Sequence, residues 1–220
     1  MALGLFLRCL YYSAWKMSEA ACIMCGLGYA GQDPKDPSRP LFNRVENISI
    51  RDVEFASNPR MLFDNWNKNT ASWLKRSIYT RVIARAHKPS TATYLTYFSS
   101  ALWHGFKPGY YLCFLTAALM TLTGRALRRH LRPLFTEDSV LHPYKPIYDF
   151  LGWLGSMFLI NYCVMPFYSF TFVRSFHLWK TIWFSGHILM ISVLVASKNK
   201  VVVRTIDNLK KRLTIVDKTQ

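Results

Sequence analysis

Two long apolar runs stand almost back to back towards the C-terminal end of the chain, at residues 147–173 and 176–197. A helix needs about 20 residues to cross the roughly 30 Å hydrocarbon core of a bilayer, and each run is long enough. The core of a soluble domain does not require two such runs in succession. We therefore expect an all-α fold, a polytopic helical membrane protein.

The distribution of charge distinguishes a membrane protein from a nucleic-acid-binding protein. Lys and Arg number 28 against 12 Asp and Glu, and 51% of the residues are apolar, a composition that fits both classes. The basic residues gather in short blocks between the apolar runs, at 75–88, 125–132 and 198–212, which is typical of cytosolic loops. We expect the lipid bilayer as a partner and no nucleic acid.

The pattern predicts a single membrane domain over residues 1–220. Residues 31–60 are rich in Pro, Asp and Asn and predict a loop with little regular structure. The expected segments are an apolar helix at 1–30, a loop with an amphipathic asparagine segment at 31–92, a broken helix pair at 93–123, transmembrane helices at 147–173 and 176–197, and a basic cytosolic tail at 198–220.

The apolar run at 93–123 is interrupted at its centre by His-Gly-Phe-Lys-Pro-Gly. Both of its flanks are basic, which places both ends on the cytosolic side and favours a re-entrant hairpin over a single crossing. We expect the kink at Pro108-Gly109, with two arms of roughly 15 residues that are each short for a full span.

His104 is the first functional candidate, because an ionisable side chain at a break in a membrane helix is costly. A lone histidine on an apolar face is more often a hydrogen-bonded core residue. The helix-breaking Gly105 and Pro108 beside it favour a functional role, and an imidazole can accept a proton near neutral pH. His187 has no such break beside it, and we expect it to hydrogen bond between helices.

Residues 64–76, DNWNKNTASWLKR, contain a second candidate motif in which Asn65, Asn67 and Asn69 alternate. Asparagine forms turns and tryptophan marks membrane interfaces, so a structural interpretation is open. An asparagine amide also donates hydrogen bonds to a developing oxyanion, so a catalytic interpretation is equally open. The Cys-x-x-Cys at 22–25 has no second pair, and we expect no metal site.

Taken together, NWNKNTASWLKR and SSALWHGFKPGYY resemble the paired signature of the membrane-bound O-acyltransferases. More narrowly, they resemble the lysophospholipid acyltransferase branch, especially its fungal members. YYSAWKMSEAACIMCGLGYAG near the start and RALRRHLRPLF at 125–135 resemble the same branch. The resemblance implies the C-terminal half of such an enzyme, with Met1 as an internal start.

This resemblance implies transfer of an acyl group from acyl-CoA, a co-substrate, to the free hydroxyl of a lysophospholipid in the endoplasmic reticulum membrane, with no further cofactor. It implies His104 as the catalytic histidine and Asn67 as the catalytic asparagine, with Asn65 as a rival. His104 would act as general base, and Asn67 would stabilise the oxyanion or orient the imidazole. The expected substrate-binding residues are Asn65, Trp66, Trp73, Lys75, Arg76, Trp103, Tyr110 and Tyr111.

Three alternatives remain open from the residues. One is a family member that acylates another hydroxyl, such as that of a protein serine, a sterol or diacylglycerol. Another is a truncated, inactive product that retains a binding role. The third is a transporter in which His104 serves a proton or substrate pathway, although this leaves the motif at 64–76 unexplained. The arginines at 125–132 are most simply a cytosolic anchor, with anionic lipid or phosphate as a second interpretation.

Overall fold

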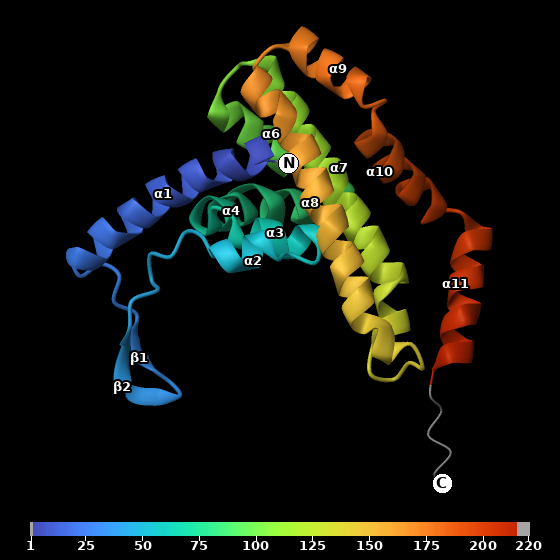
Figure 1. Cartoon of the computed structure of the whole chain (residues 1–220), viewed down its shortest axis with the longest axis horizontal. Coiled ribbons are helices and arrows are strands. Elements are labelled where there is room, and N and C mark those ends of the chain that lie inside the picture. The colour runs from blue at the N-terminus through green and yellow to red at the C-terminus, as the bar shows by residue number, and fades with distance from the viewer. Residues whose placement is uncertain (1, 215–220) are drawn as a thin grey trace.

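The computed structural model describes residues 2–214, and this part of the chain is mostly helical, with one small antiparallel hairpin (Figure 1). The all-α expectation is confirmed. The elements are α1 (Ala2–Met24), β1 (Gly31–Asp33), β2 (Asp36–Leu41), α2 (Ile50–Glu54), α3 (Pro59–Asn65), α4 (Lys68–Leu74), the π-helical η1 (Lys75–Tyr79), α5 (Thr80–Ala86), α6 (Pro89–His104), α7 (Pro108–His130), the 3₁₀ helices η2 (Arg132–Phe135) and η3 (His142–Tyr144), α8 (Lys145–Ser169), α9 (Phe172–Thr181), α10 (Ser185–Ala196) and α11 (Lys200–Leu213).

The break in the run at 93–123 lies at residues 105–107, between α6 and α7. Gly105 ends α6 with φ of +119°, a conformation that glycine adopts without the strain a Cβ would bring. Pro108 begins α7, where its missing N–H leaves no helical hydrogen bond unmade. The sequence predicted the kink at Pro108-Gly109, and the break lies immediately before these two residues.

The two arms of this hairpin differ in length. α6 has 16 residues, as expected for a short arm, and packs beside α7. The expectation of a short second arm is wrong, because α7 continues to His130 and its 23 residues are long and apolar enough to cross a membrane. The stretch from His142 to Ser169, which ends in α8, meets the same criteria.

The span expected at 176–197 is two helices instead of one. α9 and α10 meet at an angle of 77° across residues 182–184. Trp183 and Phe184 have positive φ values of 56° and 48°, which a continuous right-handed helix does not contain. Within residues 2–214 there are thus two candidate spans, or three if the bent pair counts as one.

Residues 31–92 contain more regular structure than the sequence predicted. The hairpin of β1 and β2 projects from the helices at the lower left of Figure 1, and α2 to α5 follow it. The hairpin turn is held by short side chains, since Lys35 N–H donates to Asp33 Oδ1 at 2.9 Å and Ser38 N–H donates to Asp36 Oδ1 at 3.1 Å. The expectation of a loop with little regular structure at 31–60 is therefore wrong.

Two buried clusters hold the helices together. The first joins α1, the segment 48–62 and α8, and the second joins α7, α8, α9 and α10. The first consists of Tyr12, Ile48, Val53, Ala56, Leu62 and Met157, and the second of Met120, Leu159, Tyr162, Cys163, Trp179 and Met190.

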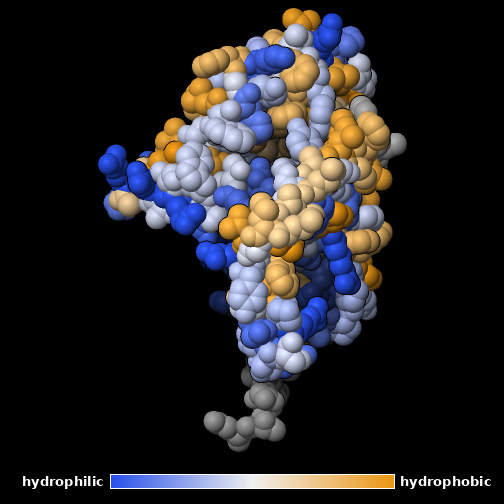
Figure 2. Space-filling view, turned by 90° about the vertical axis from the view of Figure 1, so that its left-hand side faces the viewer, coloured by the Kyte–Doolittle hydropathy of each residue, from blue (hydrophilic) through white to orange (hydrophobic). Residues whose placement is uncertain are grey.

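Large hydrophobic side chains also cover outer surfaces, and Figure 2 shows broad hydrophobic areas beside hydrophilic ones on one face of the molecule. On α8, for example, Phe150, Leu151 and Leu154 are exposed. Contiguous exposed apolar area of this kind is typical of a surface that meets a bilayer or another apolar helix.

The N-terminal end of α7 packs against the C-terminal end of α8 with no space for a side chain. Gly109 N–H donates to the carbonyl oxygen of Phe170 at 3.0 Å, and a Cβ on Gly109 would collide with the carbonyl oxygen of Pro166. Both neighbours are backbone atoms, which cannot rotate away as a side chain would.

We expect Gly109→Ala to destabilise the protein by about 1–3 kcal/mol, the usual cost of forcing extra atoms into a packed interior. Thermal unfolding in detergent micelles measures the effect as a lower Tm. Gly155→Ala on α8 is the matched control, because its added Cβ meets nothing within 4 Å. Equal Tm values for the two variants would contradict the close approach of α7 and α8.

Candidate active site

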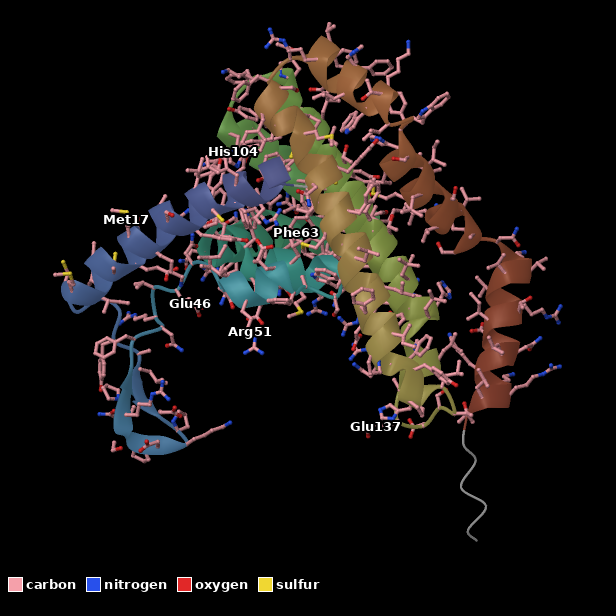
Figure 3. The ribbon with its side chains drawn as sticks, viewed as in Figure 1. Met17, Glu46, Arg51, Phe63, His104 and Glu137 are labelled. Carbon is pink, nitrogen blue, oxygen red and sulfur yellow. The ribbon has the colours of Figure 1, made fainter. Side chains whose placement is uncertain are left out.

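A cavity of about 1120 Å³ lies between α1, the α3–α4 segment, α6, α7 and α8. Both predicted catalytic residues, Asn67 and His104, line it, although they come from different elements. Figure 3 shows His104 at the end of α6, close to where α1 crosses. The fold therefore brings the two sequence motifs to one space.

Aromatic rings surround His104 on several sides. Its imidazole stacks on Phe114 with ring centroids 4.9 Å apart, and the rings of Phe167 and Tyr110 lie at 5.3 and 5.8 Å. Within residues 2–214, no hydrogen bond reaches either ring nitrogen. His104 is thus held by packing, and its nitrogens remain available to a bound molecule.

Asn67 lies immediately before α4 and lines the cavity. Its backbone is left-handed, with φ of 48° and ψ of 56°, a conformation that asparagine tolerates better than most residues. Its side chain makes no hydrogen bond to the start of the helix, the usual role of an asparagine at this position. The amide is therefore not engaged in capping α4.

Asn65, the rival, occupies a structural position. Its side-chain Nδ2 donates to the carbonyl oxygen of Met61 at 2.9 Å, and its own carbonyl oxygen accepts from Ser49 N–H at 3.2 Å. It is absent from the cavity lining. These positions favour Asn67 over Asn65 as the reacting asparagine.

The predicted substrate-binding residues divide into two groups. Trp66 and Lys75 line the cavity, and the Trp66 ring packs edge-on against Trp15 of α1 at 5.0 Å. The others lie outside the cavity lining, and two tryptophans among them are 49% and 63% exposed, which favours anchoring at a membrane interface. This second group comprises Asn65, Trp73, Arg76, Trp103, Tyr110 and Tyr111.

Four arginines of α7 and η2, which the sequence most simply predicted to be a cytosolic anchor, line the cavity. They are Arg125, Arg128, Arg129 and Arg132. Their spacing of i, i+3, i+4 and i+7 puts them on one helix face, a signal the sequence contained. Within residues 2–214 no carboxylate forms an ion pair with any of them.

The cavity is elongated along α7 and changes character along its length. Near His104 it is lined by apolar side chains such as Phe114 and Ala117, and farther along α7 by the arginines. Cys113 and Arg129 both line it, and at 1.5 Å per residue they are roughly 24 Å apart along the helix. The cavity thus suits a long molecule with an apolar end and an anionic end.

A half-buried polar network fixes α1 beside this cavity. Arg8, which lines the cavity, donates to both carboxylate oxygens of Glu54 at 2.7 and 2.9 Å, and the Tyr12 hydroxyl donates to the same carboxylate at 2.6 Å. Burial alone would raise the pKa of Glu54, but the bonds from Arg8 and Tyr12 outweigh burial and hold this pKa below its ordinary value.

His187 has the role expected from the sequence. Its Nδ1 hydrogen bonds with the Tyr162 hydroxyl of α8, and its Nε2 lies 3.4 Å from the Thr116 hydroxyl oxygen of α7. It therefore links three helices and lies outside the cavity lining.

Comparison with known proteins assigns the class of protein. Residues 1–165 match the family described as MBOAT, membrane-bound O-acyltransferase, and the chain belongs to this family. It is 43% identical over 191 residues to the lysophospholipid acyltransferase of Saccharomyces cerevisiae, an alignment that covers 86% of this chain and 31% of the relative. The expected family is thereby confirmed.

Two further relatives agree. The chain is 36% identical over 190 residues to the lysophospholipid acyltransferase of Schizosaccharomyces pombe, covering 85% of this chain and 37% of the relative. It is 37% identical over 185 residues to membrane-bound glycerophospholipid O-acyltransferase 2 of Rattus norvegicus, an alignment that covers 84% of this chain and 34% of the relative. The chain therefore spans about a third of the length of these curated relatives, less than the half that the resemblance implied.

The lowered pKa of Glu54 predicts a loss of stability in acid. Because the pKa is lower in the folded than in the unfolded chain, the carboxylate stabilises the fold at neutral pH, and this contribution disappears as the pH falls through the folded pKa. We expect Glu54→Gln to cost about 1–3 kcal/mol at pH 7 and to remove this part of the pH dependence below about pH 5.

Thermal unfolding in detergent at pH 7 and pH 4 measures both effects. Asp207→Asn serves as a control, since the Asp207 carboxylate makes only an exposed pair with Lys210. A Glu54→Gln variant that loses as much Tm between the two pH values as the native chain would contradict the role of this carboxylate.

Proposed function

We propose that this cavity transfers an acyl group from acyl-CoA to the free hydroxyl of a lysophospholipid. The observation that carries the proposal is the lining of one elongated cavity by Asn67, by His104 and, farther along α7 from His104, by four arginines. Family membership supports acyl transfer, and the names of the yeast relatives support a lysophospholipid as acceptor.

His104 acts as the general base. The acceptor hydroxyl oxygen attacks the thioester carbonyl carbon, and its proton passes to an imidazole nitrogen as the new C–O bond forms. The C–S bond then breaks, and the thiolate of coenzyme A takes a proton from the imidazolium. The absence of hydrogen bonds to His104 within the described residues supports this role, since a base must have a free nitrogen.

Asn67 stabilises the charge that develops during this attack. As the thioester carbonyl becomes tetrahedral, its oxygen becomes negative, and a positioned amide N–H can hydrogen bond to it. The uncapped amide of Asn67 at the cavity wall supports this role. Orientation of the His104 imidazole by the same amide is the other role open to it.

The arginines of α7 and η2 bind the phosphate groups of acyl-CoA. Guanidinium groups form paired, charge-assisted hydrogen bonds with phosphate oxygens. The basic end is separated from His104 by much of α7, so a molecule anchored there by its phosphates can extend its thioester towards the base. Arg125 has a further contact, donating to the Thr93 hydroxyl at 2.7 Å, which holds its side chain in place.

The arginine end of the cavity faces the cytosol in this proposal. Clusters of Lys and Arg next to membrane spans remain on the cytosolic side, and acyl-CoA is a charged cytosolic molecule. The acceptor, by contrast, is a lipid that reaches the cavity from the bilayer. We place the reaction in the endoplasmic reticulum membrane.

The first test is the transfer of labelled oleoyl-CoA to a panel of lysophospholipids by membranes that contain the chain. We expect His104→Ala to lower the rate about 10²–10⁴-fold through loss of the base, and Asn67→Gly about 10²–10³-fold through loss of an oxyanion donor. Glycine adopts the left-handed backbone of residue 67 without strain, so the variant removes the side chain and leaves the backbone conformation in place.

His130→Ala and Asn208→Ala are the matched controls, since neither side chain lines the cavity. Both should retain the native rate. Folded native chain without transfer to any lysophospholipid, or full activity of His104→Ala, would overturn the proposal.

A second test concerns the arginines. We expect Arg128→Gln and Arg129→Gln together to raise the KM for acyl-CoA about 10–100-fold, the value of a charge-assisted hydrogen bond of about 1.5–3 kcal/mol, while kcat stays close to native. Steady-state kinetics over a range of acyl-CoA concentrations measures this. Arg204→Gln on α11, outside the cavity lining, should leave KM unchanged. An unchanged KM in the double variant would exclude phosphate binding at these arginines.

A further inference from the structure

The start of α4 is capped by a residue from a distant segment. In most helices the side chain just before the first turn accepts a hydrogen bond from the second or third helical N–H. In α4 that residue is Asn67, which makes no such bond. The second N–H, of Asn69, donates instead to Asn47 Oδ1 at 3.1 Å.

Asn47 also binds the first helical N–H of α4. Lys68 N–H donates to the backbone carbonyl oxygen of Asn47 at 2.8 Å. On the other side of Asn67, Ser49 N–H donates to the carbonyl oxygen of Asn65 at 3.2 Å. The segment at 47–49 is therefore hydrogen bonded to the backbone on both sides of Asn67.

Asn47 is itself fixed by α1. Glu19, which is only 8% exposed, accepts from Asn47 N–H at 2.7 Å and from Ile48 N–H at 3.2 Å through its Oε1. Its other oxygen, Oε2, pairs with Lys16 Nζ at 2.6 Å. A second ion pair, Lys68 Nζ to Glu46 Oε2 at 3.1 Å, joins the two segments at the surface.

We propose that Asn47 is a positioning residue that caps α4 in place of Asn67 and thereby frees the Asn67 amide for the cavity. The proposal rests on the proposed role of Asn67 in acyl transfer. An asparagine can use its side-chain oxygen as a helix cap, which fixes the orientation of its amide, or hold that amide towards a substrate. Because Asn47 caps α4, the side chain of Asn67 is not needed as a cap and can point its amide towards a substrate.

The kinetic test compares Asn47→Ala with Asn47→Asp. Alanine removes the capping oxygen and leaves the Asn69 N–H without its acceptor, so residue 67 moves to the extended backbone of an ordinary cap and its side chain turns back to α4. We expect kcat to fall about 10–100-fold, with KM for both substrates within about twofold of native. Aspartate keeps a capping oxygen and should restore kcat. Asn199→Ala is the matched control, because Asn199 caps α11 in the ordinary way and lies away from the cavity.

A purely structural role for Asn47 would give a different result. Asn199→Ala and Asn47→Ala would then both lower Tm, and neither would change kcat selectively. Native kcat in Asn47→Ala, or failure of Asn47→Asp to restore it, overturns the proposal.

A stability cycle tests the capping without any measurement of activity. In Asn47→Ala the Asn67 side chain replaces the lost cap, so Tm should fall only slightly, and Asn67→Gly alone should also have a small effect because Asn47 still caps α4. The double variant has no cap, and its Tm should fall by more than the sum of the two single shifts. Additive shifts overturn the proposal.

If the native chain shows no acyl transfer but the cycle is non-additive, the proposed function fails while the capping by Asn47 stands.

Discussion

The close contact between the start of α7 and the end of α8 is the constraint on which the rest of the structure depends. Only a glycine at residue 109 allows the backbone of α7 to meet the carbonyl oxygen of Pro166 and to hydrogen bond to Phe170. α7 is one continuous helix, so this contact fixes its direction over 23 residues. Phe114, on which His104 stacks, and Arg125, Arg128 and Arg129 all lie on this one helix.

In the proposed mechanism, the asparagine before α4 faces two competing requirements. A helix needs acceptors for its first N–H groups, and a catalytic amide needs to be free of such acceptors. The structure supplies the acceptors from Asn47, which Glu19 of α1 holds in turn. On our proposal, Asn47 thereby caps α4 in place of Asn67.

Charged side chains in membrane proteins usually have partners. Beside this cavity, Arg8 has a carboxylate partner and the arginines of α7, within residues 2–214, do not. Arg8 and Glu54 satisfy each other beside the cavity, whereas the arginines of α7 face it without a carboxylate among the described residues. Unpaired positive charge of the same sign repels itself, a cost that an anionic ligand removes. The same helix thus lines an apolar part of the cavity near His104 and a basic part farther along, which our proposal assigns to the acyl chain and to phosphates.

The sequence by itself determined the helical membrane class, the break between α6 and α7, and the two motifs that contain Asn67 and His104, because these depend on local composition and on residues such as Pro108. It did not predict the bend between α9 and α10 or show which of Asn65 and Asn67 lines the cavity, since each depends on contacts between distant segments. Only the tertiary structure brought α1 and Asn47 to the asparagine motif and turned the arginines of α7 towards the cavity. A helical pattern shows which residues share a face, but packing decides what that face meets.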